Sequence, residues 1–209
     1  MLTEKEKKVF QDIAQTGLLE TLRALSKLSD RQWCAFPRAF SFETIEQARA
    51  GFPASEPARF SGDLILEGDM PMHLLCIFPQ ESALTLMYFL TGQSEKVSDL
   101  ASMQTLAVAE VSNILANAFL NVIANTLKVR LLPRTPRVLV GSRSQIIDSA
   151  LSRAGAHPDY ALVTELRLES ENLTMTGTLC ILLDRTALGN LIGKIHDSPA
   201  WTERTRKIF

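Results

Sequence analysis

The sequence repeats one order of secondary-structure elements, and this repeat limits the possible folds more than any other feature. Each half is predicted to contain a long helix, a strand, a short helix, a β-hairpin and a final helix, from the spacing of apolar residues between turn residues. The predicted elements are residues 3–28, 32–42, 43–50, 58–66, 70–78 and 82–90 in the first half, and 98–127, 129–140, 144–154, 160–168, 173–183 and 186–195 in the second. The two sets match element for element, which indicates a duplication.

Individual residues match at nearly constant offsets. The segment CIFPQESALTLM from Cys76 aligns with CILLDRTALGNL from Cys180, 104 positions later, and Pro37 precedes Pro136 by 99. The two cysteines are interpreted as equivalent buried strand positions. A duplicated unit of this kind usually joins its hairpins into one sheet covered by helices. We therefore expect one α+β domain, residues 1–209, whose α-β-α-β-β-α halves (about 1–93 and 98–196) are related by a pseudo-two-fold axis and share a sheet covered by long helices.

The second long helix is the most apolar one, yet polar side chains interrupt it at regular intervals. It lies in the stretch LAVAEVSNILANAFLNVIANTLKVRLLPRTP, residues 106–136. At ~100° per residue, one sector roughly 120° wide contains Glu110, Asn113, Asn117, Asn121 and Asn125. Asparagine favours caps and turns over helix interiors, so four on one side need a reason. For the last three, a solvated face and a functional face both stay open, whereas for Glu110 and Asn113 the functional interpretation is favoured.

A resemblance to a known family rests on this pair. Glu110-x-x-Asn113, followed 23 residues after the asparagine by Pro136, resembles the motif of the CheC/CheX/FliY family, phosphatases of the chemotaxis response regulator CheY. The segment FPQESALTLMYFLTG, residues 78–92, also resembles the family. Two positions differ: Leu106 stands where the family often has Asp or Ser, and Ser112 replaces its usual Gly. The resemblance implies a CheC-like fold.

A carboxamide on this helix suits phosphoryl chemistry. It is neutral, donates and accepts hydrogen bonds, and can orient a water in line with a phosphoryl group, a reaction that depends mainly on positioning. In the resembled family, Asn113 is implied to position the hydrolytic water, while Glu110 contacts a lysine of the phosphorylated regulator and Asn117 and Pro136 border the same binding surface. The Mg²⁺ belongs to the regulator, so no cofactor of the protein's own is expected. The implied partner is a phosphorylated CheY-like regulator, and a CheD-like stimulating partner stays open.

The duplication also predicts the remnant of a second site. Asp12 and Gln15 precede Glu110 and Asn113 by 98 positions, and Pro37 corresponds to Pro136. The acid is one methylene shorter and the amide one methylene longer than in the second half, so this site is predicted to be degenerate. An alternative for the whole chain is a non-catalytic CheC-like interaction module related to the flagellar switch proteins, which share the architecture but lack the catalytic pair.

Composition excludes several other classes. A formal net charge of −1 gives no electrostatic footprint for nucleic acid or an anionic membrane. Three cysteines without a CxxC pair favour a reducing compartment. The start, MLTEKEKKVF, is charged where a secretion signal is apolar. The long apolar helix could span a bilayer by length, but its Glu and Asn residues favour a buried core helix. These observations predict a soluble, cytoplasmic protein with no membrane or nucleic-acid partner.

Metal and nucleotide motifs are absent from the sequence. His73, His157 and His196 have no ligand spacing, so no metal site is expected, and each is interpreted as a surface or packed residue. No P-loop and no GxGxxG occurs. The tail, residues 197–209, carries Trp201 and Phe209 among charged residues, and both docking to a partner and folding back onto the core stay open.

Overall fold

The duplicated order of elements is present in the computed structural model, which describes residues 2–29, 32–37, 41–50, 57–91, 99–153, 158–171 and 173–198. The elements of the first half are α1 (Glu4–Ser29), β1 (Cys34–Pro37), β2 (Ser41–Thr44), α2 (Ile45–Ala50), β3 (Arg59–Gly68), β4 (Met72–Pro79) and α3 (Gln80–Thr91). Those of the second are α4 (Leu100–Leu127), β5 (Leu131–Pro133), β6 (Arg137–Gly141), α5 (Arg143–Arg153), β7 (Tyr160–Ser170), β8 (Leu173–Leu183) and α6 (Arg185–Asp197).

All strands join one antiparallel sheet in the order β1-β7-β8-β4-β3-β5. Two short strands form each edge, because β2 also pairs with β7 and β6 also pairs with β3. If each strand is replaced by its counterpart in the other half, the same strand order results, read from the opposite edge of the sheet. The strands β4 and β8 meet in the middle, and the edge strands beside β7 come from the first half and those beside β3 from the second. The predicted α+β fold is confirmed. Superposition of the two halves, and with it the pseudo-two-fold axis and the single-domain boundaries, stays a prediction.

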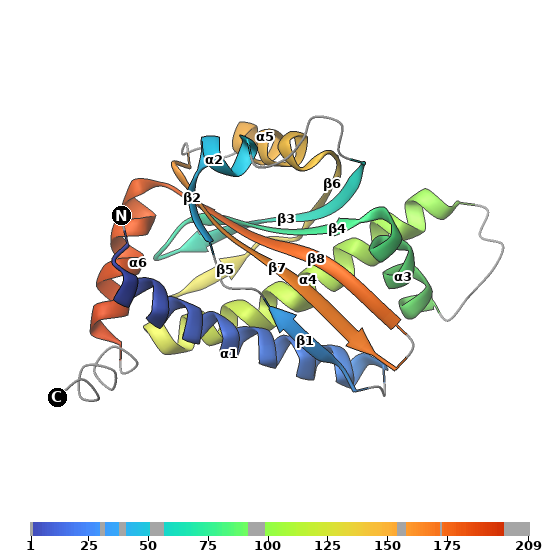
Figure 1. Ribbon diagram of the computed structural model, residues 1–209, viewed down its shortest axis with the longest axis horizontal. Coiled ribbons are helices and arrows are strands. Elements are labelled where there is room, and N and C mark those ends of the chain that lie inside the picture. Colours follow the sequence, from blue (N-terminus) through green and yellow to red (C-terminus); the bar gives the residue numbers. More distant parts are fainter. Residues whose placement is uncertain are drawn as a thin grey trace.

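Helices cover both faces of the sheet (Figure 1). The larger core lies between the sheet and α1, α3, α4 and α6, and a smaller one lies under α2 and α5 on the opposite face. The long helices α1 and α4 run antiparallel, and two of their contacts are close. The Thr21 hydroxyl donates to the Leu115 carbonyl at 3.3 Å, and Gly17 packs so tightly on Phe119 that a Cβ on the glycine would lie 2.8 Å from the ring. At the offset of 98, Gly17 corresponds to Leu115 and Thr21 to Phe119. The contact of Thr21 with Leu115 and that of Gly17 with Phe119 therefore involve the same two positions of the repeat, with the helices exchanged.

The helix α4 is a core helix. It is long and apolar enough to cross a membrane by length and composition, but half of its most apolar window is buried inside the protein. Its buried residues are Gln104, Ala107, Val108, Val111, Ser112, Leu115, Ala116, Phe119, Leu120, Ile123 and Leu127. It begins after Asp99, whose side chain accepts from the backbone N–H of Ser102 at 3.1 Å, and ends at Lys128 in the left-handed conformation, φ 54°.

The cap predicted for the first helix is confirmed, and two further helices begin with the same arrangement. Thr3 and Glu6 form the expected capping box, with bonds of 2.6 Å from the Thr3 N–H to the Glu6 carboxylate and 3.3 Å from the Glu6 N–H to the Thr3 hydroxyl. The same reciprocal pair starts α2, from Thr44 and Gln47, and α5, from Ser142 and Gln145. These last two boxes are 98 positions apart, so the duplication extends to the capping chemistry.

The continuous strand predicted for residues 129–140 was wrong in its extent, and part of the strand predicted for residues 32–42 lies outside the described residues. The prediction for residues 32–42 corresponds to β1 and β2, and that for 129–140 corresponds to β5 and β6. In the second case Pro136 stands just before β6, where a residue without an N–H cannot donate to a sheet ladder. The backbone N–H of Arg134 instead donates to the Ile65 carbonyl at 2.9 Å, which holds the interruption against β3.

Candidate functional site

The polar stripe of α4 lies on the surface of the helix. Glu110, Asn117, Asn121 and Asn125 are exposed and Asn113 is half-buried, while Val111 and Ser112 between the pair are buried. Burying a carboxylate without a partner destabilises the folded state by several kcal/mol, so Glu110 is expected to lie at the surface of this apolar helix. Among the residues that the structure describes, Glu110 makes no hydrogen bond or ion pair. Its charge is therefore presented to solvent.

Asn113 is held by its neighbour one turn later. The Nδ2 atom of Asn117 lies 2.8 Å from the backbone oxygen of Asn113 and 2.9 Å from its side-chain Oδ1. The amide of Asn113 is therefore anchored at its oxygen. No spacing rule predicted this bond, because it depends on side-chain rotamers of two exposed residues.

One exposed apolar residue precedes the pair on α4, and another lies on a sheet-edge strand that contacts this helix. Leu106, one turn before Glu110 on the same face, is 69% exposed, and Val140 at the sheet edge is 59% exposed. Val140 lies two residues beyond the partly buried Val138 on β6, so it faces the same side of the sheet as α4. Pro136 is half-buried in the connection between β5 and β6, and both strands contact α4. The face of α4 that carries Glu110 and Asn113 thus combines one charge, carboxamides and the exposed aliphatic side chain of Leu106.

Ser112, which lies between Glu110 and Asn113, contacts the sheet and so sets the distance of this part of α4 from β3. Its side chain is fully buried over Gly62 of β3, where a Cβ would lie 2.2 Å from the Ser112 Oγ and 2.3 Å from its Cβ. Gly62 thus leaves room for the Ser112 side chain, at a position where the resembled family usually has glycine. Cys76, paired with Gly62 across the sheet, is also buried; burial raises the pKa of its thiol to about 12 against a smaller opposing effect of the Ser112 hydroxyl.

The equivalent positions in the first half do not form a similar arrangement. On α1, Asp12 is half-buried and Gln15 exposed, and the residue one turn after Gln15 is Leu19, 53% exposed, which cannot donate a hydrogen bond. Arg23 forms an ion pair with Glu20 on the same helix. Pro37 is the last residue of β1, paired with Leu166 of β7.

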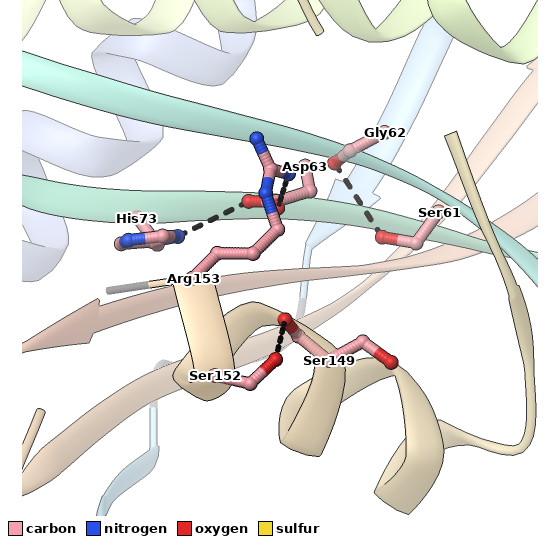
Figure 2. A network of polar contacts seen from close by, with 7 residues as sticks. All are labelled: Ser61, Gly62, Asp63, His73, Ser149, Ser152 and Arg153. Carbon is pink, nitrogen blue, oxygen red and sulfur yellow. Dashed lines mark hydrogen bonds and ion pairs between the residues drawn. The ribbon is translucent and has the colours of Figure 1, made fainter. Parts of the chain in front are cut away.

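Sequence reasoning missed a buried charged cluster on the opposite face of the sheet (Figure 2). Asp63 of β3 has a fully buried carboxylate that contacts Arg153 at the end of α5 and lies 3.2 Å from Nδ1 of His73 on β4. The cluster ties α5 to the two strands, and removing one partner would leave an uncompensated buried charge. Its members are up to 90 positions apart in the sequence, so no local spacing indicates them.

A second histidine, His196, joins two helices. His196 of α6 lies 2.8 Å from the Glu6 carboxylate, so it links the two helices. Burial opposes ionisation of Glu6, but hydrogen bonds from Thr3 and His196 outweigh it and lower its pKa. Among the described residues no cluster of three or more His, Cys, Asp or Glu could hold a metal ion. His157 and the tail residues Trp201 and Phe209 lie outside the described residues.

Comparisons with known proteins agree with this picture. No family model matches the chain. In sequence it is similar to the CheY-P phosphatase CheC of Bacillus subtilis (strain 168), 23% identical over 170 residues, which cover 78% of this chain and 80% of CheC. In structure it is similar to FliY of Thermotoga maritima (TM-score 0.74, 13% identity, 94% and 98% of the two chains). It is also similar to the FliM middle domain of H. pylori (TM-score 0.61, 11% identity, 92% and 99%).

These findings confirm the resemblance to the CheC/CheX/FliY family that the Glu-x-x-Asn motif predicted. They also confirm the fold, which FliM shares.

Proposed function

We propose that this CheC-like protein is a cytoplasmic phosphatase that hydrolyses the phospho-aspartyl group of a CheY-like response regulator. The observation that carries the proposal is the Glu110-x-x-Asn113 pair, intact on the exposed face of α4 in a chain similar to CheC. Exposed on the outside of a long, rigid helix, the pair can enter the active site of another protein. A concave pocket of its own is not required.

Asn113 acts by positioning. Its carboxamide orients a water in line with the bond between phosphorus and the aspartyl oxygen of the regulator. Attack of the water oxygen on phosphorus breaks that bond and yields the free aspartate carboxylate and inorganic phosphate, with a proton released to solvent. The amide is neutral and does not take this proton. The Mg²⁺ held by the phosphorylated regulator neutralises charge on the phosphoryl oxygens.

Glu110 acts by binding. Its exposed carboxylate pairs with a lysine of the regulator and so sets the register in which Asn113 reaches the phosphoryl group. Because this ion pair exists in both the ground state and the transition state, its loss raises KM as well as lowering kcat/KM. Asn117 and Pro136 border the same surface, and the exposed Leu106 adds apolar contact area.

The test measures dephosphorylation of a phosphorylated CheY-like regulator by the wild-type protein and by Asn113→Ala. We expect Asn113→Ala to lower kcat by ~100-fold or more while regulator binding persists, because a misplaced or missing positioning group costs about that much. Glu110→Ala should weaken binding too. The matched control is Asn125→Ala, which removes the same type of side chain from a more exposed position of the same stripe, about three turns further along the helix, and should leave turnover within about twofold. Equal turnover in Asn113→Ala and Asn125→Ala contradicts the proposed function.

Two observations favour a second candidate, a non-catalytic interaction module. The fold is shared with the FliM middle domain, and Leu106 replaces the polar residue that the family often has one turn before the glutamate. In that case the same surface binds a chemotaxis or flagellar protein without hydrolysis. Saturable binding of the phosphorylated regulator with no acceleration of its dephosphorylation would establish this alternative.

A further inference from the structure

We propose that Asn117 is a positioning residue that fixes the orientation of the Asn113 carboxamide. Its catalytic consequence rests on the proposed function, whereas its geometric part stands on the two hydrogen bonds alone. The sequence resemblance placed Asn117 at the border of the binding surface. The hydrogen bonds show that its side chain contacts Asn113.

The orientation of both amides follows from one backbone carbonyl. A carbonyl oxygen can only accept, so the Asn117 atom 2.8 Å from the Asn113 carbonyl must be the NH₂ group. The second hydrogen of that group points to the side chain of Asn113 at 2.9 Å. The atom there must be Oδ1, because a flipped Asn113 amide would set two NH₂ groups against each other.

The fixed amide presents a defined pair of functions to a partner. One lone pair of the Asn113 Oδ1 accepts the hydrogen bond from Asn117, and the other is available to a further donor. The NH₂ group of Asn113 is directed away from Asn117. One amide plane then offers an acceptor for a water O–H and a donor for a phosphoryl oxygen. Without Asn117 the terminal torsion of asparagine is broad, so both flips and many intermediate angles are populated.

Spacing alone does not produce this bond. Asn121 and Asn125 repeat the four-residue interval on the same exposed face, but neither makes such a bond to the preceding asparagine among the described residues. The interaction is therefore specific to the asparagine that belongs to the Glu-x-x-Asn motif. The stripe accordingly divides into an oriented pair, Asn113 and Asn117, and two solvated residues.

The test uses Asn117→Asp, which keeps the shape of the side chain but removes its hydrogens. An aspartate carboxylate cannot donate to either oxygen of Asn113, and it favours the flipped amide. Asn121→Asp is the matched control, because it adds the same charge to the same face one turn further. We expect Asn117→Asp to lower kcat by ~10-fold, or ~1.4 kcal/mol, with a change in KM no larger than that of Asn121→Asp. Equal kcat values in the two variants, or a change confined to KM, would overturn the proposal.

A second measurement does not depend on turnover. The ¹H–¹⁵N signals of the Asn113 side-chain amide, assigned by their loss in Asn113→Ala, should shift in Asn117→Asp and stay in place in Asn121→Asp. Unshifted signals overturn the proposal whatever the activity. If the signals shift but Asn113→Ala retains full turnover, the proposed function fails while the orienting contact stands.

Discussion

The contact between Gly62 and Ser112 makes a sharp prediction about how α4 is seated on the sheet. In Gly62→Ala the new methyl carbon would lie 2.2 Å from the Ser112 Oγ and 2.3 Å from its Cβ, where ordinary contacts begin near 3.4 Å. The hydroxyl can rotate away but the Cβ cannot, so helix and strand must separate by on the order of 1 Å. Overpacking of this kind costs ~1–3 kcal/mol. Gly62 is paired on both sides, with Cys76 and Val138, so we expect the upper part of that range.

The second substitution, Ser112→Gly, should rescue the first. Once the serine side chain is removed, the nearest atom of residue 112 is its Cα at 3.8 Å, an ordinary contact. Ser112→Gly alone costs ~0.5 kcal/mol in helix propensity plus the loss of packing. In the double variant the methyl group on residue 62 fills the space that the serine side chain leaves. The double variant should therefore be more stable than Gly62→Ala alone, with a coupling energy of ~2 kcal/mol.

Urea unfolding of the four proteins measures this coupling, provided that the m-values agree. Gly189→Ala is the control, because no atom lies within 4 Å of the added Cβ and the same substitution on α6 should stabilise by ~0.5–1 kcal/mol. Additive effects of Gly62→Ala and Ser112→Gly would refute the steric argument. Since Ser112 precedes Asn113, Gly62→Ala should also lower turnover, and the double variant should recover it.

The remaining predictions concern the thiols and the first half. Burial raises the pKa values of Cys76 and Cys180 to about 12, with the charge of Glu43 adding to the effect at Cys180, whereas Cys34 is exposed. Only one of the three thiols should therefore react with an aromatic disulfide reagent near pH 8 before urea is added, and all three should react afterwards; three fast thiols in the native protein would contradict this burial. Gln15→Ala should leave phosphatase turnover within about twofold of wild type in the assay used for Asn113→Ala.

Local signals in the sequence predicted most of the fold. The capping box of Thr3 and Glu6 fixed the start of α1, and the turn after β3 lies at Gly68, whose φ of 117° only glycine adopts readily. The repeat predicted which elements return in the second half. These features were accessible because each depends on residues a few positions apart.

Contacts between distant residues were not accessible in the same way. The ion pair of Asp63 with Arg153 and the fit of Ser112 over Gly62 join segments that meet only in the folded chain. For the candidate site, the exposure of Glu110 followed from the cost of burying an unpaired carboxylate. The bond from Asn117 to Asn113 did not follow, because the sequence contains three four-residue intervals between stripe asparagines and only this one is bridged among the described residues.

That bond also gives a reason for the expected inactivity of the first half. Gln15 has one more torsion than Asn113, and the residue at the position equivalent to Asn117 is Leu19, which cannot donate a hydrogen bond to the Gln15 amide. An unheld glutamine loses more conformational freedom when it positions a water, which lowers its effect even if it reaches the phosphoryl group. Arg23, already paired with Glu20, adds a cation where the second half has Asn121, and this charge opposes a regulator lysine. If Gln15→Ala nevertheless halves turnover and only the double variant with Asn113→Ala is inactive, orientation by Asn117 is not what distinguishes the two helices, and both sites work.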